Sequence, residues 1–234
     1  MKIDEDIMIN SIQCIDFQDG VSCTSSLFQS KEGFLKLNYS FLSGNVYGIV
    51  SDFGCGSWGL VTCLGGRCSK YYTGQILIDG IRTPANNLLS HSAFIGESIF
   101  EGVNSKSDIL SPQKCIERAL AISGQNYTVD EIKSMFSLSD ERFECDLNYV
   151  SGEIDRISIA VNYALGKDIY CFPWLNEHDI CNVSKAVLRI LKENKKIVLI
   201  PTSQKRQVKR LADHLIVFCR GKIVFKMGRC KLDG

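Results

Sequence analysis

The feature that most restricts the fold of this chain is a glycine-rich turn between a short apolar strand-like run and a helix-like run. The strand-like run is VYGIV at residues 46–50, the turn is SDFGCGSWG at residues 51–59, and LVTCL continues as the helix-like run. In such an arrangement backbone N–H groups converge at a helix N-terminus, where the helix dipole favours an anion. The turn therefore predicts an α/β protein with a candidate phosphate site at residues 51–59.

The rest of the chain alternates strand-like and helix-like segments, as α/β proteins do. The strand-like runs occupy residues 34–41, 75–79, 169–172 and 197–200, and the helix-like runs occupy residues 112–122, 157–165 and 183–191. Residues 215–218 and 222–225, joined by Arg220 and Gly221, indicate a terminal hairpin. We predict a single domain over residues 1–234, with a small helical lobe between about residues 107 and 147.

Charge and cysteine usage exclude several classes of function. The chain has 27 basic and 26 acidic residues, so we expect no overall field that would attract nucleic acid or an anionic membrane. Its 11 cysteines are scattered without a C-x-x-C pair, so we predict no metal site and a reduced, cytoplasmic interior. No run of about 18 apolar residues occurs, and work at a membrane would therefore need another subunit as anchor.

Taken alone, the glycine-rich turn favours a dinucleotide site. Gly54, Gly56 and Gly59 match the fingerprint G-x-G-x-x-G, and Asp79 ends a strand-like run at the distance of a ribose-binding acid. The second interpretation is a P-loop, G-x-x-x-x-G-K-[ST], which requires a lysine and a hydroxyl where this chain has Ser57 and Trp58. The third is a strained turn that binds no ligand.

Segments along the rest of the chain decide between these interpretations. Together with the glycine-rich turn, and in the same order, they resemble the nucleotide-binding domain of ATP-binding cassette (ABC) transporters. Residues 48–59 resemble the loop GLIGPNGAGKST, and TGQILIDG at 73–80 is close to TSGEILIDG. SGEIDRISIA at 151–160 is similar to the signature segment SGGERKRVSIA, and LADHLIV at 211–217 followed by GKIV at 221–224 is similar to the closing LADRIAVL and GKIV. The resemblance covers about residues 10–226. It implies a P-loop NTPase (RecA-like) core with an antiparallel β lobe and the helical lobe, and it makes Asp79 a turn residue.

The resemblance also shows where the chain departs from the family's phosphate chemistry. In that family two cassettes enclose ATP, and each site pairs the P-loop of one subunit with the signature of the other. The P-loop lysine position carries Ser57, which removes the cation that balances the β- and γ-phosphates. The position of the magnesium-binding hydroxyl carries Trp58, which has no oxygen.

The carboxylate and histidine positions are altered as well. Counted from Arg156, the acidic Walker B residue falls on Pro173 and the catalytic glutamate on Trp174, and neither side chain can act as a general base. Ser203 occupies the place of the switch histidine, and Glu97 lies near the expected Q-loop glutamine. Glu177 and Asp179 follow nearby, but they match a loop at the family's dimer seam, where a solvated charge is expected.

Some binding positions look retained. Phe28 precedes the glycine loop at the interval of the family's adenine-stacking aromatic, with Phe17 or a plain core role as alternatives. The glycines of the loop form a vestigial nucleotide-binding set, at Gly54, Gly56 and Gly59. Part of the signature remains at Ser151, Gly152 and Glu153, although an ungapped alignment places the key serine on Val150.

We therefore expect an ABC cassette without ATP hydrolysis, with weak or absent ATP binding and no other cofactor. The resemblance implies a second cassette subunit, identical or different, and a transmembrane permease as partners. The chain would then be cytoplasmic and peripheral at the inner face of the cell membrane, and no nucleic acid partner is expected. The alternatives are a soluble regulatory or interaction protein that reuses the fold, and an ATPase that works with displaced residues.

Overall fold

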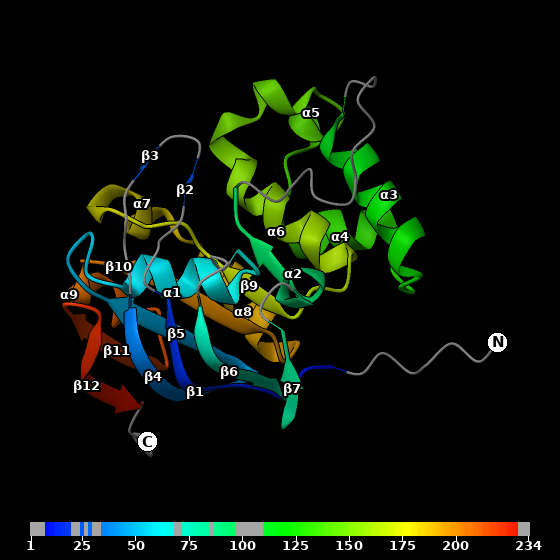
Figure 1. Ribbon diagram of the computed structural model, residues 1–234. Coiled ribbons are helices and arrows are strands. Elements are labelled where there is room, and N and C mark those ends of the chain that lie inside the picture. Colours follow the sequence, from blue (N-terminus) through cyan, green and yellow to red (C-terminus); the bar gives the residue numbers. More distant parts are fainter. Residues whose placement is uncertain are drawn as a thin grey trace, which may run out of the picture.

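The computed structural model describes residues 8–19, 24–25, 28–29, 34–67, 72–84, 87–96 and 110–228. Its centre is a six-stranded sheet in the order β12-β11-β5-β10-β9-β8 (Figure 1). Five strands are parallel, and only β12 runs antiparallel at the edge. Their bounds are β5 Asn45–Val50, β8 Ser92–Phe94, β9 Ile169–Cys171, β10 Ile197–Thr202, β11 His214–Cys219 and β12 Lys222–Gly228.

A second, antiparallel sheet has the order β4-β1-β6-β7. It consists of β1 Ser11–Asp19, β4 Phe34–Leu42, β6 Thr73–Ile78 and β7 Ile81–Thr83, and a separate pair is formed by β2 Thr24–Ser25 and β3 Phe28–Gln29. Asp79 and Gly80 join β6 to β7 with φ of 48° and 81°, the left-handed conformation that a two-residue hairpin turn requires. The antiparallel β lobe predicted from the N-terminal region and the hairpin from Gly74 to Gly80 is confirmed.

The six-stranded sheet separates two hydrophobic cores, because successive residues of a strand point to opposite faces. Ile197 and Leu199 of β10 face the antiparallel sheet and α1 (Ser57–Leu64), which is buried along its whole length. Val198 and Ile200 face the helices on the other side. Those helices include α6 Ile154–Ala164, α7 Glu177–Asn182, α8 Lys185–Glu193 and α9 Lys205–Val208, while α2 Leu88–His91 leads into β8.

Three further helices occupy the segment in which the helical lobe is predicted, and they project above the sheets in Figure 1. They are α3 Pro112–Ser123, α4 Val129–Met135 and α5 Asp140–Phe143, and they are followed by the 3₁₀ turns η3 Leu147–Tyr149 and η4 Ser151–Glu153. Local sequence explains the helix ends: Ser111 caps α3 with proline at its first position, and Thr128 forms a capping box with Glu131. Within the described residues, no helix has the length and apolar composition that crossing a membrane requires.

The topology excludes a dinucleotide fold. In that fold the strand after the first helix lies parallel to the first strand, in the same sheet. Here β6 follows α1 into the antiparallel sheet, and the neighbours of β5 are β10 and β11. Asp79 has no ribose role in this arrangement, because its carboxylate accepts hydrogen bonds from the backbone N–H groups of Asn10 and Ser11.

Candidate functional site

The glycine-rich turn lies at the carboxyl end of β5, between the ends of two other strands. The Ser51 N–H donates to the Thr202 carbonyl oxygen at 3.1 Å, and the Gly221 N–H donates to the Cys55 carbonyl oxygen at 2.9 Å. Gly54 and Gly56 have φ of 83° and 111°, and Gly56 is the N-cap of α1. The chain therefore keeps the strand–turn–helix path of a phosphate loop, held by β10 and by the β11–β12 hairpin.

Ser57, at the lysine position, is the first residue of α1 and is fully buried. Its Oγ lies 2.7 Å from Ser51 Oγ, which in turn lies 2.8 Å from the carbonyl oxygen of Asp52. The Ser57 hydroxyl therefore closes the loop on itself and offers no charge to a ligand. Residues 51–60 contain no basic side chain, and the exposed Asp52 adds a negative one. A phosphate at this position would lack the charge-assisted bonds that hold it in a working P-loop.

Three aromatic side chains meet beside this loop, and we call Phe53, Trp58 and Trp174 the aromatic cluster. The Phe53 ring stacks on the Trp58 indole, with 5.8 Å between centroids and 29° between planes. Trp174 meets the edge of Phe53, with 5.5 Å between centroids and 83° between planes. The cluster thus joins the two positions at which the sequence resemblance predicts the magnesium-binding hydroxyl and the catalytic glutamate.

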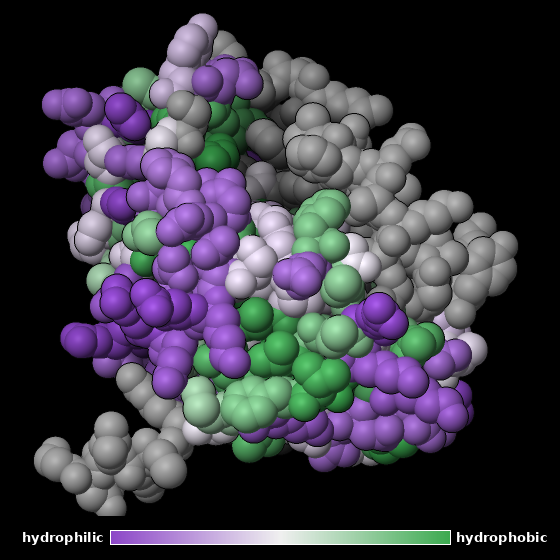
Figure 2. All heavy atoms as spheres, turned by 90° about the vertical axis from the view of Figure 1, so that its left-hand side faces the viewer, coloured by the Kyte–Doolittle hydropathy of each residue, from purple (hydrophilic) through white to green (hydrophobic). Residues whose placement is uncertain are grey.

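Burial differs within the aromatic cluster. Trp58 is only 5% exposed, and its Nε1 is buried with no hydrogen-bond partner among the described residues. Phe53 is 51% exposed, and Leu35 and Phe225 are also exposed large apolar residues. Figure 2 shows that hydrophobic residues gather on this side of the molecule, where the β11–β12 hairpin lies, next to a hydrophilic area. The rim of the glycine-rich turn therefore carries an exposed apolar side chain, that of Phe53.

The segment after β9 is held against β10 without a carboxylate. Pro173 and Trp174 are partly buried, and the Leu175 N–H donates to the Pro201 carbonyl oxygen at 3.0 Å. Thr202 Oγ1 donates to the Leu175 carbonyl oxygen at 2.6 Å. Because these bonds are made by backbone and hydroxyl groups, the segment keeps its place although the family's two acids are absent.

Glu177 and Asp179, the acidic residues that follow Trp174, lie in a helix and not in the glycine-rich turn. Glu177 begins helix α7, where its Oε1 accepts a hydrogen bond from Gln207 of α9 at 3.3 Å. Asp179 lies in the same short helix, and its N–H is capped by the Asn176 side chain at 3.0 Å. A short helix that Asn176 starts therefore replaces the expected loop, while both residues are exposed, as expected of solvated charges. Glu177 is engaged in tying α7 to α9.

The switch position is equally altered. Ser203 is exposed after β10, and its Oγ accepts from Gln204 Nε2 at 3.2 Å. His178 lies in α7, and His214 lies at the start of β11, where it stacks on Tyr47 with 4.9 Å between ring centroids. The start of β11 lies at the amino end of the parallel strands, opposite the loop. His214 is therefore remote from the candidate site.

The remaining predicted ligands have different outcomes. Phe28 belongs to β3, and only its backbone is described. Phe17, its alternative, is fully buried with its ring centroid 5.2 Å from that of Phe34, so it is a core residue of the antiparallel lobe. Glu97 lies outside the described residues. Gly59 lies within the buried helix α1.

The signature residues lie at the start of α6. Ser151, Gly152 and Glu153 form the 3₁₀ turn η4, which follows the 3₁₀ turn η3, so a 3₁₀ turn and not a strand leads into α6. Val150 is fully buried, so the ungapped serine position faces the core. Gly152 is exposed, and a Cβ atom built there would lie 3.5 Å from Arg142 Nη1. The turn thus leaves Gly152 accessible at the N-terminal end of an 11-residue helix.

Sequence reasoning missed the contribution of Phe53. It expected Trp58 to be a core aromatic that packs across the vacant site, and it identified Trp174 only as the loss of the catalytic glutamate. The signal was available: an aromatic residue in the glycine loop and two tryptophans at neighbouring strand ends can meet if the strands are adjacent. Only the strand order, which places β5 beside β10 and β10 beside β9, shows that they do.

Comparison with known proteins supports the fold. No family model and no curated protein matches this chain. Two solved structures of the ATP-binding cassette MJ0796 are similar to this chain. One is the dimeric post-hydrolysis state bound to ADP and Pi, with a TM-score of 0.67 at 14% identity, and the other is the dimeric structure of MJ0796, a bacterial ABC transporter cassette, with a TM-score of 0.66 at 15% identity. Each match covers 94% of this chain and 100% of the MJ0796 chain. A bacterial Atm1-family ABC exporter with ATP bound has a TM-score of 0.64 at 14% identity, over 98% of this chain and 39% of the exporter. With its strand order, antiparallel lobe and phosphate-loop path, the chain therefore has the fold of the nucleotide-binding cassette of ABC transporters.

Proposed function

We propose that this chain is a non-hydrolysing cassette subunit that pairs with another cassette and docks on a membrane permease. It would then be cytoplasmic and held at the inner face of the cell membrane by that permease. The observation that carries the proposal is the aromatic cluster, which joins the positions of two catalytic groups while the cassette fold around it is complete. Such a change removes chemistry and preserves a docking scaffold.

Hydrolysis requires several groups that act together, and this chain supplies none at their usual places. Ser57 offers no cation for the phosphates, and Trp58 offers no oxygen to magnesium. Pro173 and Trp174 cannot accept a proton from the attacking water. Because catalytic groups that act as a unit contribute non-additively, restoring one of them should not restore turnover.

Nucleotide binding should be weak for the same reason. Stacking of the adenine on one aromatic ring contributes about 1–3 kcal/mol. Micromolar affinity requires about 8 kcal/mol, and the difference normally comes from the lysine, the metal and the loop. An apolar rim adds to the deficit, because a phosphate placed beside it loses hydration without gaining donors.

The proposal assigns the active role to the signature side. In a pair with an intact cassette, the site built on this chain's loop would be inactive, whereas the opposite site would need only N–H donors near the γ-phosphate. The exposed turn at Gly152, at the N-terminal end of α6, is suited to that contact because the helix dipole favours an anion there.

Three measurements on the purified protein test this function. Magnesium-dependent ATPase activity should be absent in the wild type and in Ser57→Lys, and calorimetry should give a dissociation constant for ATP no tighter than high micromolar, with or without magnesium. Tagged protein should co-purify from membranes with a permease and a cassette subunit. Turnover at rates ordinary for cassettes contradicts the proposal, and a protein recovered without membrane partners favours a regulatory or interaction protein with the same fold.

A further inference from the structure

A groove of about 550 Å³ lies on the opposite side of the sheet's strands from the phosphate loop, at their amino ends. One wall is helix α8, the other is the segment that leads into β11, and the turn between β4 and β5 closes one end. We call this the basic groove; its lining residues include Lys185, Leu188, Arg189, Lys192, Arg210 and Leu211. It shares no residue with the aromatic cluster.

The charge of the basic groove is not that of the whole chain. The lining holds five basic side chains (Lys185, Arg189, Lys192, Lys195 and Arg210) against two acidic ones (Glu193 and Asp213), although the whole protein carries a net charge of only +1. Lys192 pairs with Asp213, which also accepts from the Val46 N–H. Among the described residues, Lys185, Arg189 and Arg210 make no ion pair, and all three are exposed. The groove is therefore a concentrated and largely uncompensated positive surface.

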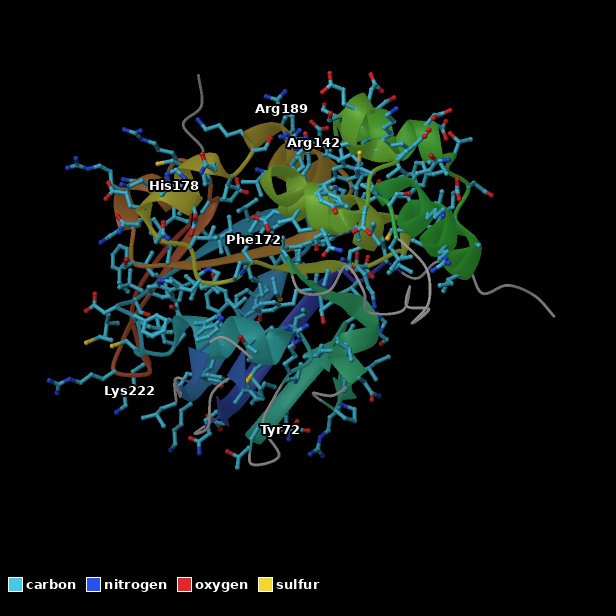
Figure 3. The ribbon with its side chains drawn as sticks, turned by 90° about the horizontal axis from the view of Figure 1, so that it is seen from above. Tyr72, Arg142, Phe172, His178, Arg189 and Lys222 are labelled. Atoms are coloured by element: carbon cyan, nitrogen blue, oxygen red, sulfur yellow. The ribbon has the colours of Figure 1, made fainter. Side chains whose placement is uncertain are left out.

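The spacing of the cations is regular. Lys185, Arg189 and Lys192 follow one another at i, i+4 and i+7 along α8, which places them on one face of the helix over about 10 Å. Arg210 stands on the opposite wall. Figure 3 shows the Arg189 side chain on the outer surface, far from Tyr72 on the other side of the molecule.

The floor of the groove is apolar. Leu188 and Val46 lie beneath it and are only 4% and 2% exposed, so the apolar surface that a ligand can reach is mainly that of the partly buried Leu211. A ligand that uses both floor and walls must carry aliphatic groups on one side and negative charges along its edges. An amphipathic helix with acids at i, i+4 and i+7 has that form, and helix-in-groove recognition follows this spacing.

Other polyanions fit less well. Single-stranded nucleic acid gains affinity by stacking its bases on aromatic rings, and the described lining residues include none. A membrane surface would meet the exposed cations but not the recessed leucines. We propose that the basic groove binds an acidic, amphipathic helical segment of a partner protein, independently of any nucleotide at the opposite end of the sheet.

The test uses fluorescence anisotropy with a labelled helical peptide that has glutamates at i, i+4 and i+7 and leucines on its other face. At the physiological ionic strength of about 0.15 M, the wild type should bind it. The triple variant Lys185→Glu, Arg189→Glu, Arg210→Glu should bind at least about tenfold more weakly, the ratio that about 1.4 kcal/mol produces. The control triple Arg82→Glu, Lys114→Glu, Lys222→Glu changes the net charge equally at exposed sites elsewhere and should bind within twofold of the wild type.

Changes in the peptide keep the test independent of protein folding. Replacing its leucines by serine should weaken binding, because the apolar floor then has no partner, and replacing its glutamates by lysine should abolish it. Circular dichroism confirms that both triple variants are folded. The proposal is overturned by no binding at about 100 μM wild-type protein, by equal loss in the two triples, by equal binding of the serine peptide, or by tighter binding of single-stranded RNA or anionic vesicles.

Discussion

Trp58 provides the sharpest test of the aromatic cluster, because the structure predicts a large loss of stability for one substitution at this position and a small loss for another. The indole is 5% exposed, stacks on Phe53, and has a buried Nε1 without a hydrogen-bond partner among the described residues. Truncation of a buried tryptophan to alanine costs about 3–5 kcal/mol. The unpaired N–H costs the wild type about 1–3 kcal/mol, and its removal offsets part of that loss.

We therefore expect Trp58→Ala to lower the free energy of unfolding by about 2–3 kcal/mol, which corresponds to a decrease in Tm of about 5–10 °C for a domain of this size. Trp58→Phe keeps a ring against Phe53 and removes the unpaired donor, so its cost should stay below about 1 kcal/mol. Urea unfolding followed by circular dichroism measures both values.

The comparison of Trp58→Ala with Trp58→Phe also shows which results would contradict the aromatic cluster. Equal destabilisation by Trp58→Ala and Trp58→Phe means that Nε1 is hydrogen-bonded in solution and that the indole is needed as such. No destabilisation by either variant means that the cluster does not form. Both tryptophans of the chain belong to the cluster, so the fluorescence of Trp174 in either variant reports whether its surroundings persist.

Three other predictions follow from separate features. Lys196 and Asp168 form a buried ion pair at 2.8 Å, so Lys196→Met should lower the free energy of unfolding by about 3–5 kcal/mol. Adding Asp168→Leu in the same chain should recover most of this loss. Equal stability of the single and double variants in urea unfolding would contradict a coupled pair. Burial lowers the pKa of His214 below its usual 6.5, so the unfolded chain binds this proton more readily. The stability contribution is therefore present above about pH 6.5 and is lost as the pH falls from that value to the lower pKa of the folded state. His214→Phe, which keeps the stacking on Tyr47, should flatten the unfolding free energy between pH 7.5 and 5 relative to the wild type, and an unchanged slope would disprove the assignment. In a purified complex with an intact cassette, Gly152→Asp should suppress ATPase activity by at least about tenfold, because it adds negative charge at the α6 N-terminus. A matched Trp58→Phe complex should keep its rate. Full activity in the Gly152→Asp complex would contradict the proposed contact of this turn with the partner's ATP site.

Much of the fold follows from local pattern. The strand-like runs at residues 46–50, 169–172 and 197–200 are continuous apolar segments, which favours strands buried on both faces, and all three lie in the parallel sheet. Positive φ at Arg220 and Gly221 closes the predicted terminal hairpin. These features are local, because they depend on side-chain period and on backbone conformations that a few neighbouring residues determine.

The candidate site divides in the same way. The sequence by itself determined the identities of Ser57, Trp58, Pro173 and Trp174, which the resemblance places where the family has its cation, metal ligand and base. Only the tertiary structure decided what stands there instead: that Ser57 bonds to Ser51, and that Phe53 joins two tryptophans 116 positions apart in the numbering into one cluster. The same holds for Asp79, which matched a ribose ligand by spacing and proved to cap the start of β1. Contacts between distant segments depend on strand order, and strand order is set by the burial of whole faces of the sheet, which no single stretch of residues encodes.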